Sequence, residues 1–264
     1  AVLLRPLPYA EPDRLVFVSD QREGRASSMS PGRLTDLRRR ADVLEGVAGS
    51  SEVPVTLVGG DHPEPLVAGT VSTDFFRVLG VKAALGRTFD VGRENQRVAV
   101  LTHGLWQRRF GGDPSIVGRD IALDSGNHTV LGVLPQAFSW APYGGTGRQP
   151  ELWLPAPVGE IPAVPPGTPV DRLTELRDFY YFMSVARMKP GLSLDQVNAG
   201  LAMLAGQLAA EHPVTDKSRG LRAVPALRQV TADARTPLLL VLGAVFLVFA
   251  VACANVANLL LGRT

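Results

Sequence analysis

The sequence predicts a water-facing α+β domain with two lobes, followed by one transmembrane α-helix. Three observations support this fold class. The segment 238–261 carries no charged side chain. The outer sections of the chain alternate short apolar runs with helical patterns, which is typical of β-α-β units. The section between them contains a hairpin pattern, so it is expected to form a lobe of its own.

The first outer section begins with an apolar run at 15–18 that predicts a buried strand. Ser30 and Pro31 predict a helix start, because a serine hydroxyl can cap free amides and proline suits the first helical position. Helical spacing places five apolar residues on one face of this helix: Leu34, Leu37, Ala41, Leu44 and Ala48. The pattern continues with strands at 53–58 and 66–71, and with a brief helix that Gly80 ends.

The middle section predicts a strand at 97–101 and a short helix capped by Thr102. Two apolar runs, 121–123 and 129–133, flank a turn and predict a β-hairpin. The stretch 135–169 is rich in proline and glycine. It is either a functional loop or a partly disordered connection.

The last section predicts a buried strand at 179–186. Ser193 and Gln196 have the spacing of a capping box at a helix start. The buried face expected for this helix is Val197, Leu201, Leu204 and Leu208. A final strand is expected at 221–227, just before the charge-free run.

Together these patterns divide the chain. Residues 10–80 and 178–230 are expected to form one lobe and residues 81–177 an inserted α/β lobe, with no sheet running continuously through both. Residues 1–9 are interpreted as the tail of a preceding membrane segment, since they are too short for a signal-peptide core.

The charge-free run predicts a transmembrane helix over 237–261. At about 1.5 Å per residue, it spans roughly 36 Å, against a hydrocarbon core of about 30 Å; the alternative is a buried core helix. Asn255 and Asn258 lie on one helix face, where Ala250 and Ala254 permit close approach. They predict a helix–helix contact inside a membrane bundle, the alternative being a solvated helix end.

The composition excludes several function classes. A net charge of +2 gives no basis for nucleic-acid binding. The only cysteine, Cys253, lies in the membrane run, which excludes cysteine nucleophiles and cysteine-based zinc sites from the rest of the chain. The four histidines are scattered, and neither a nucleophile elbow nor a phosphate loop is found. We therefore expect no catalytic residues, no metal and no cofactor, and no binding or hydrolysis of ATP by this chain.

Several segments carry a family resemblance. Residues 253–263 (CANVANLLLGR) resemble the start of the FtsX-like permease module of ATP-binding-cassette (ABC) exporters of the MacB class. The upstream segments that look like the MacB-type periplasmic core domain are 4–9 (LRPLPY), 75–81 (FFRVLGV), 85–89 (LGRTF), 105–114 (LWQRRFGGDP) and 188–193 (MKPGLS). The chain is similar to the MacB-like permeases of the duplicated orphan type typical of acidobacteria.

The resemblance implies a fold, a location and partners. The first lobe would be porter-like, and residues from about 10 to 235 would lie outside the inner (cytoplasmic) membrane, in the periplasm. The implied function is that of a permease component in an ABC-type export or mechanotransmission system. The implied partners are membrane lipid, a separate ABC ATPase subunit, a second permease copy and a periplasmic adaptor.

Two other function classes remain open at this point. A membrane-anchored extracytoplasmic binding or sensor domain without transport fits the same pattern. A tethered hydrolase is the weakest alternative, because no nucleophile–base pair or metal set is found.

Overall fold

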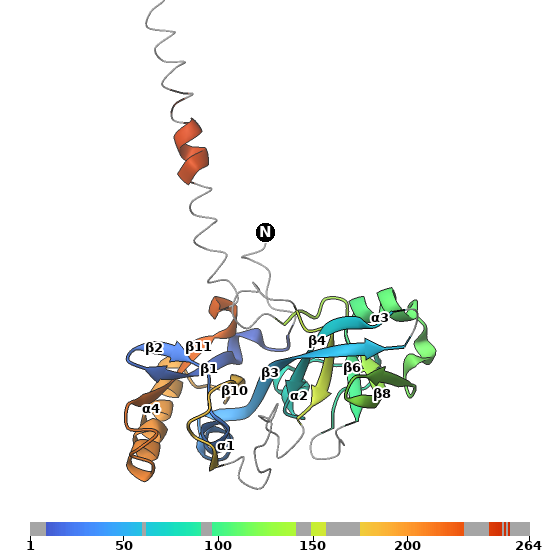
Figure 1. The fold of residues 1–264 in the computed structure, drawn as a ribbon. Coiled ribbons are helices and arrows are strands. Elements are labelled where there is room, and N and C mark those ends of the chain that lie inside the picture. Colours follow the sequence, from blue (N-terminus) through green and yellow to red (C-terminus); the bar gives the residue numbers. More distant parts are fainter. Residues whose placement is uncertain are drawn as a thin grey trace, which may run out of the picture.

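The computed structural model describes residues 9–59, 62–90, 97–140, 149–156, 175–229, 243–249, 251 and 253. These residues form a mixed α/β fold with two lobes (Figure 1). Helices α1 and α4 cover one end of the sheet, and α3 lies at the opposite end.

One lobe consists of two β-α-β units whose strands interleave. Its elements are β1 (Leu15–Arg22), α1 (Pro31–Arg40), the first part of β3 (Leu44–Val58), β10 (Met183–Met188), α4 (Leu194–Glu211) and β11 (Arg219–Pro225). The strand order is β11-β1-β10-β3, with every neighbouring pair antiparallel. Strands β1 and β3 are therefore parallel, with β10 between them, which is the ferredoxin-like arrangement of split β-α-β units. We call this part the ferredoxin-like lobe; a short strand, β2 (Arg25–Ser27), pairs with β1.

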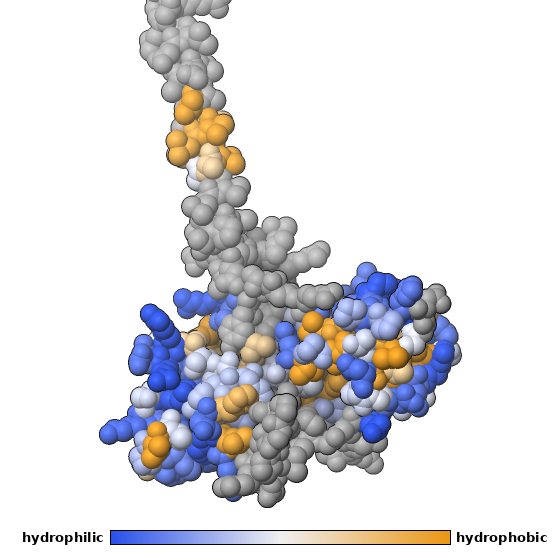
Figure 2. Space-filling view, viewed as in Figure 1, coloured by the Kyte–Doolittle hydropathy of each residue, from blue (hydrophilic) through white to orange (hydrophobic). Residues whose placement is uncertain are grey.

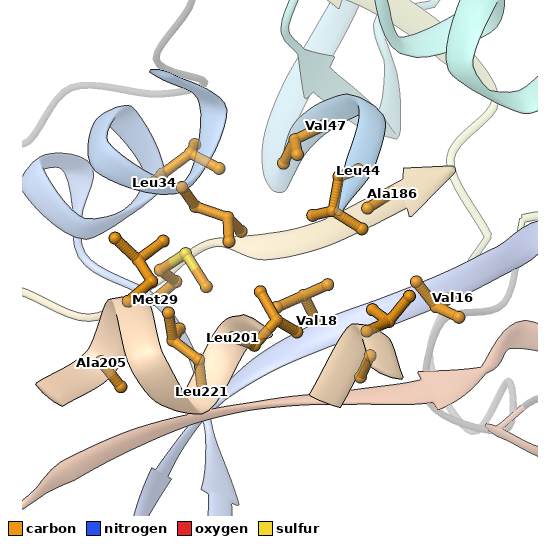
Figure 3. Close-up of a cluster of buried hydrophobic side chains, with 14 of the residues drawn as sticks. Val16, Val18, Met29, Leu34, Leu44, Val47, Ala186, Leu201, Ala205 and Leu221 are labelled. Atoms are coloured by element: carbon orange, nitrogen blue, oxygen red, sulfur yellow. The ribbon is translucent and has the colours of Figure 1, made fainter. Parts of the chain in front are cut away.

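The core of this lobe lies between the sheet and its two helices (Figure 3). Alternation along β1 directs Val16 and Val18 into this core. Leu201 and Ala205 come from α4, and Leu34 comes from α1. The buried face predicted for α4 is confirmed, since Val197, Leu201, Leu204 and Leu208 are all buried.

The helix starts were predicted well and one helix end was not. The capping box of Ser193 and Gln196 is present at α4. Ser30 is the N-cap residue of α1, although its hydroxyl makes no capping hydrogen bond. The prediction that Leu44 and Ala48 continue the face of α1 is wrong, because both lie in strand β3. Pairing with β10 determines their conformation more strongly than local helical spacing.

The second lobe is a closed barrel of six strands. Its strands are the second part of β3, β4 (Glu64–Val71), β9 (Leu152–Pro155), β6 (Val98–Leu101), β8 (Gly126–Val133) and β7 (Asp120–Leu123). Neighbours pair in that order, and β7 pairs back to β3 through Leu57↔Leu123 and Val58↔Ala122. We call this part the barrel lobe. The predicted hairpin is confirmed as β7–β8, and Thr102 caps α3 (His103–Phe110) as predicted.

The apolar core of the barrel lobe includes side chains from β3 and β7, the two strands whose pairing closes the barrel. Leu101 and Val130 are fully buried inside it, and Leu105 of α3 packs against them as a lid on the barrel core. Strand β5 (Leu85–Gly86) pairs with the last residues of β8, on the edge opposite β6. The segment 152–154, which the sequence placed inside an irregular stretch, is the buried strand β9.

A third, aromatic cluster lies between the two lobes. It contains Phe17 of β1, Trp153 of β9, and Phe75 and Phe76 of α2 (Phe75–Leu79). The rings of Phe75 and Trp153 stack with centroids 5.2 Å apart. Gly80 ends α2 in the left-handed conformation, as the sequence predicted.

The two lobes share one sheet, so the expectation that no sheet would run through both is wrong. A single hydrogen-bonded path runs β11-β1-β10-β3-β4-β9-β6-β8-β5. Strand β3 makes the connection, because its residues 44–50 pair with β10 and its residues 50–57 pair with β4. Segment 10–80 contributes to all three cores. The lobe boundaries at residues 80 and 178 stay a prediction.

Candidate functional site: the junction with the chain ends

The residues predicted to pack in the membrane lie outside the described part of the chain: Ala250, Ala254, Asn255 and Asn258. The described residues around them, 243–249, 251 and 253, are helical and exposed; Phe246, for example, is 72% exposed. Figure 2 shows apolar side chains over the visible surface of this short segment. Within the described residues, no helix has both the length and the apolar character needed to cross a membrane.

The described residues do contain an elaborate junction where the chain enters the domain. The entry segment, residues 9–14, ends in the short 3-10 helix Pro12–Arg14, and Glu11 before it adopts a left-handed conformation with φ of 46°. Three groups hold this segment: the Arg187 guanidinium, the Arg14 guanidinium and the Tyr9 ring. All three side chains donate hydrogen bonds to backbone carbonyls, so the junction fixes the path of the main chain.

Arg187 is the buried centre of the junction, with 6% of its surface exposed. Its Nε donates to the carbonyl of Val78 at 3.0 Å, and its other two nitrogens donate to the carbonyls of Ala10 at 2.8 Å and Glu11 at 3.4 Å. Burial lowers the pKa of Arg187, and the nearby Arg14 charge adds to this effect. A guanidinium nevertheless stays protonated in proteins. One buried cation therefore ties the entry segment, the end of α2 and strand β10 together.

Arg14 makes a second clamp at the C-terminal end of strand β10. Its Nε and one terminal nitrogen donate to the carbonyl of Met188 at 3.0 and 2.8 Å. It also pairs with Glu11 and Glu45. Hydrogen bonds that include a charged partner are stronger than neutral ones, so this clamp adds to the stiffness of the entry.

Tyr9 attaches the start of the entry segment to the aromatic cluster. Its hydroxyl donates to the carbonyl of Ser139 at 2.5 Å, and its ring lies 6.3 Å from that of Phe138. Burial raises the pKa of the Tyr9 hydroxyl, which keeps it a neutral donor. Gly80 permits close approach here, because a Cβ at this position would lie 2.5 Å from the Cβ of Ala10.

The chain leaves the domain from the same cluster. Strand β11 ends at Pro225, and the next residue, Ala226, is 2% exposed and belongs to the aromatic cluster against which Tyr9 packs. Beyond it, Leu227 is 38% exposed. Entry and exit are therefore joined through one packed group of side chains.

Sequence reasoning missed this junction. The one available signal was Arg187, a charged residue directly after the apolar run 179–186 that predicted a buried strand; in the structure it lies within β10. Its partners lie more than a hundred residues away in the chain, so no local pattern identifies them. Among the described residues, no group of three or more His, Cys, Asp or Glu side chains is arranged to hold a metal ion.

The family model of the MacB-like periplasmic core domain matches residues 5–204. The chain belongs to this family. The match begins before the entry segment, includes the whole barrel lobe and ends within α4, before strand β11. The family comprises periplasmic domains of ABC permeases rather than enzymes.

Solved structures share the fold. A domain of a protein described as a permease, from Porphyromonas gingivalis, aligns with a TM-score of 0.58 at 16% identity, over 82% of this chain and 92% of that one. The periplasmic region of MacB from Actinobacillus actinomycetemcomitans gives 0.54 at 13% identity, over 86% and 94%. The extracellular domain of the noncanonic ABC-type transporter YknZ from Gram-positive bacteria gives 0.52 at 14% identity, over 80% and 99%. No curated protein sequence matches the chain significantly.

Proposed function

We propose that this chain is the extracytoplasmic domain of a permease in an ABC-type, MacB/FtsX-like export or mechanotransmission system, with one transmembrane helix over 237–261. Family membership supports the permease class. The observation that carries the mechanical role is the junction, where entry and exit share one buried cluster.

The physical argument concerns stiffness. A domain that transmits motion must be attached to its membrane helices without slack, since a flexible linker absorbs displacement. Arg187 and Arg14 make five hydrogen bonds to backbone carbonyls around the entry segment. A displacement of residues 9–14 would then move α2 and β10 as well. Because these two elements pack in the cluster between the lobes and in the shared sheet, both lobes would move.

The proposal includes a location and partners. Residues from about 10 to 235 would be periplasmic, on the inner membrane. Membrane lipid would surround the helix, a separate ABC ATPase subunit would supply energy, and a second permease copy and a periplasmic adaptor would complete the assembly. Asn255 and Asn258, beside Ala250 and Ala254, would face a neighbouring helix.

A topology experiment tests the location. In the full-length protein, Cys253 is replaced by Ser. A single new cysteine is then placed at Val214, which is 97% exposed. A membrane-impermeant maleimide added to cells with a permeabilised outer membrane should label this cysteine. A cysteine placed at Thr264 should react only after the inner membrane is opened. Labelling in the opposite order contradicts the proposal.

A second experiment tests whether the junction is coupled to ATP hydrolysis by a partner ATPase. The full-length protein is purified in mild detergent, and co-purifying proteins are identified by mass spectrometry. An ABC ATPase is expected; a kinase or cyclase module instead would favour the sensor function. With the ATPase bound, Arg187→Leu should change ATP turnover severalfold, whereas Arg222→Leu, an exposed site on β11, should not. Equal turnover in both variants would reject the mechanical role of the junction.

A further inference from the structure

The ferredoxin-like lobe contains a buried group of charged side chains that neither the junction nor the proposed function uses. We call it the charge compartment; its members are Asp20, Arg33, Asp36, Arg177, Asp216 and Arg219. They come from β1, α1, the start of β11 and the segments before β10 and β11. Arg33 and Asp20 are both fully buried.

Direct ion pairs connect the members. The Nε of Arg33 lies 2.8 Å from an oxygen of Asp20, and another Arg33 nitrogen lies 3.0 Å from Asp216. Arg177 pairs with Asp216 at 2.8 Å and also with Asp36. Arg219 faces the second oxygen of Asp20 at 3.5 Å. Its guanidinium carbon lies 3.6 Å from the centre of the Tyr180 ring.

The compartment is rich in buried polar atoms without a hydrogen-bond partner of good geometry. Seven such side-chain atoms occur among the described residues, and six of them belong to this compartment or its wall. They are Asp20 Oδ2, Asp216 Oδ1, one terminal nitrogen each of Arg33 and Arg219, and the hydroxyls of Ser27 and Ser30. Ser27 is the cross-strand partner of Asp20, and Ser30 is one helical turn before Arg33.

Three of the six face an opposite charge without a well-aligned hydrogen bond: the Arg33 nitrogen beside Asp216 at 3.0 Å, and Asp20 Oδ2 with the Arg219 nitrogen at 3.5 Å. The other three, Asp216 Oδ1 and the two serine hydroxyls, have no hydrogen-bond partner in the protein, and a buried polar group without a partner carries its full desolvation penalty. Buried polar groups are therefore paired with protein atoms or with ordered water. The six atoms include acceptors, donors and two hydroxyls that can act as either, which is the mixture whose hydrogen bonding water can complete.

We propose that the charge compartment is a built binding site for ordered water, holding about two molecules. A buried water makes about three hydrogen bonds, so about two molecules satisfy six atoms. The charges within the compartment balance, with three aspartates against three arginines. An inorganic ion would add an uncompensated charge to a buried site, whereas water adds none.

The direct test is a crystal structure of the full chain at a resolution that shows ordered water, with crystals soaked in rubidium and bromide salts. Density within hydrogen-bond distance of Asp20 Oδ2 and Asp216 Oδ1, without anomalous signal, is the expected result. An anomalous rubidium or bromide peak there would overturn the proposal. So would side chains that pair all six atoms directly.

A mutational test predicts opposite signs for a hydrated and a dry compartment. In the double variant Ser27→Ala/Ser30→Ala, a hydrated site loses water hydrogen bonds, so the urea midpoint of unfolding should fall. A dry site loses two unsatisfied hydroxyls, so the midpoint should rise. A raised or unchanged midpoint would overturn the proposal. Ser218→Ala, at an exposed position beside the compartment, is the matched control and should leave the midpoint unchanged.

Discussion

The two lobes share strand β3, but they bury different kinds of side chain. The core of the ferredoxin-like lobe adjoins the charge compartment, where Arg33 is fully buried between two aspartates. The barrel lobe is built around an apolar cluster and is closed by the pairing of β7 with β3, and the buried His128 of β8 is hydrogen-bonded to the carbonyl of Gly126. Ion pairs require defined partners and geometry, whereas apolar burial depends mainly on shape and area. The first lobe should therefore be sensitive to single charges and to pH, and the second to changes in volume.

The largest expected effect comes from Arg33→Leu. Removing this guanidinium leaves Asp20 buried without its closest partner and Asp216 with Arg177 alone, and breaking a buried ion pair costs about 3–5 kcal/mol. Urea unfolding of the full chain measures the loss. Hydrogen exchange should increase in α1, β1 and β11 and stay unchanged in β6 and β8. Arg39→Leu, at an exposed position on the same helix, should cost less than about 0.5 kcal/mol. An equal loss in both variants would contradict the role of the compartment.

The matching change in the barrel lobe is Leu101→Ala. Leu101 is fully buried, and truncation of a buried leucine to alanine costs about 2–5 kcal/mol, depending on how far the cavity collapses. In this variant, hydrogen exchange of the backbone amides should increase in β6, β8 and β9 and stay unchanged in β1 and β11. The loss should be the same at pH 5 and pH 8, because Leu101 carries no titratable group and packs in a cluster of apolar side chains. A pH-dependent loss would remove the contrast between the lobes.

The sequence predicted the two regions unequally. In the ferredoxin-like lobe, Ser193 with Gln196 and the apolar spacing of α4 are local signals, and both were confirmed. In the barrel lobe the hairpin β7–β8 was predicted, because its turn is also local. Closure of the barrel was not predicted, since β7 reaches β3 across more than sixty residues. Strand β9 was missed because it is a short apolar run between proline- and glycine-rich segments.

The junction and the charge compartment could not be predicted from local sequence patterns, for a related reason. Arg187 binds backbone carbonyls, which every residue carries, so no partner residue type could be sought. Arg33 was part of a helix pattern whose charged residues are ordinarily solvated, and only the tertiary fold brings Asp20 and Asp216 to it. The predicted residues Asn255 and Asn258 stay a prediction, as they lie outside the described residues.

The lobes should also differ in their response to pH. Burial raises the pKa of Asp20 to about 6, against the opposing effect of Arg33. An unfolded aspartate has a pKa of about 3.9, so the folded protein binds this proton more tightly. The contribution of Asp20 to stability is thus fully present below about pH 4 and is lost as the pH rises through 6.

Asp20→Asn isolates this effect. The difference in unfolding free energy between the native chain and the variant should change between pH 4 and pH 6 and be constant above pH 7. Asp120→Asn, at an exposed position in the barrel lobe, is the control and should show no such change across this window. A flat difference for Asp20→Asn would mean that its folded pKa is close to the unfolded value.

A smaller effect is expected where the ferredoxin-like lobe protects its sheet edge. The amide of Asn198 on α4 accepts from the backbone nitrogen of Ala223 at 2.8 Å and donates to its carbonyl at 3.2 Å. It thereby occupies the outer edge of β11, the last strand on that side of the sheet. Asn198→Ala should cost about 1–2 kcal/mol, because each hydrogen bond contributes about 0.5–1.5 kcal/mol.

The same variant should promote self-association, since free strand edges pair with other chains. Sedimentation of the full chain in detergent measures it. Asn198→Asp keeps the acceptor for Ala223 but loses the donor, so an intermediate result is expected. Unchanged stability and unchanged sedimentation for Asn198→Ala would show that the edge is protected by other groups.

The smallest effect distinguishes the two hairpins. In the β1–β2 turn, Glu23 and Gly24 both have positive φ, 52° and 76°. In the β7–β8 hairpin, positive φ falls on Gly126, and neither turn residue before it has one. A left-handed conformation is unfavourable for glutamate and much less so for asparagine, which is preferred in such turns. Glu23→Asn should therefore stabilise the chain by about 0.5–1 kcal/mol, measured by urea unfolding, whereas Ser125→Asn should not. Equal effects at the two sites would mean that strain at Glu23 contributes nothing, and the two lobes would then not differ in their turns.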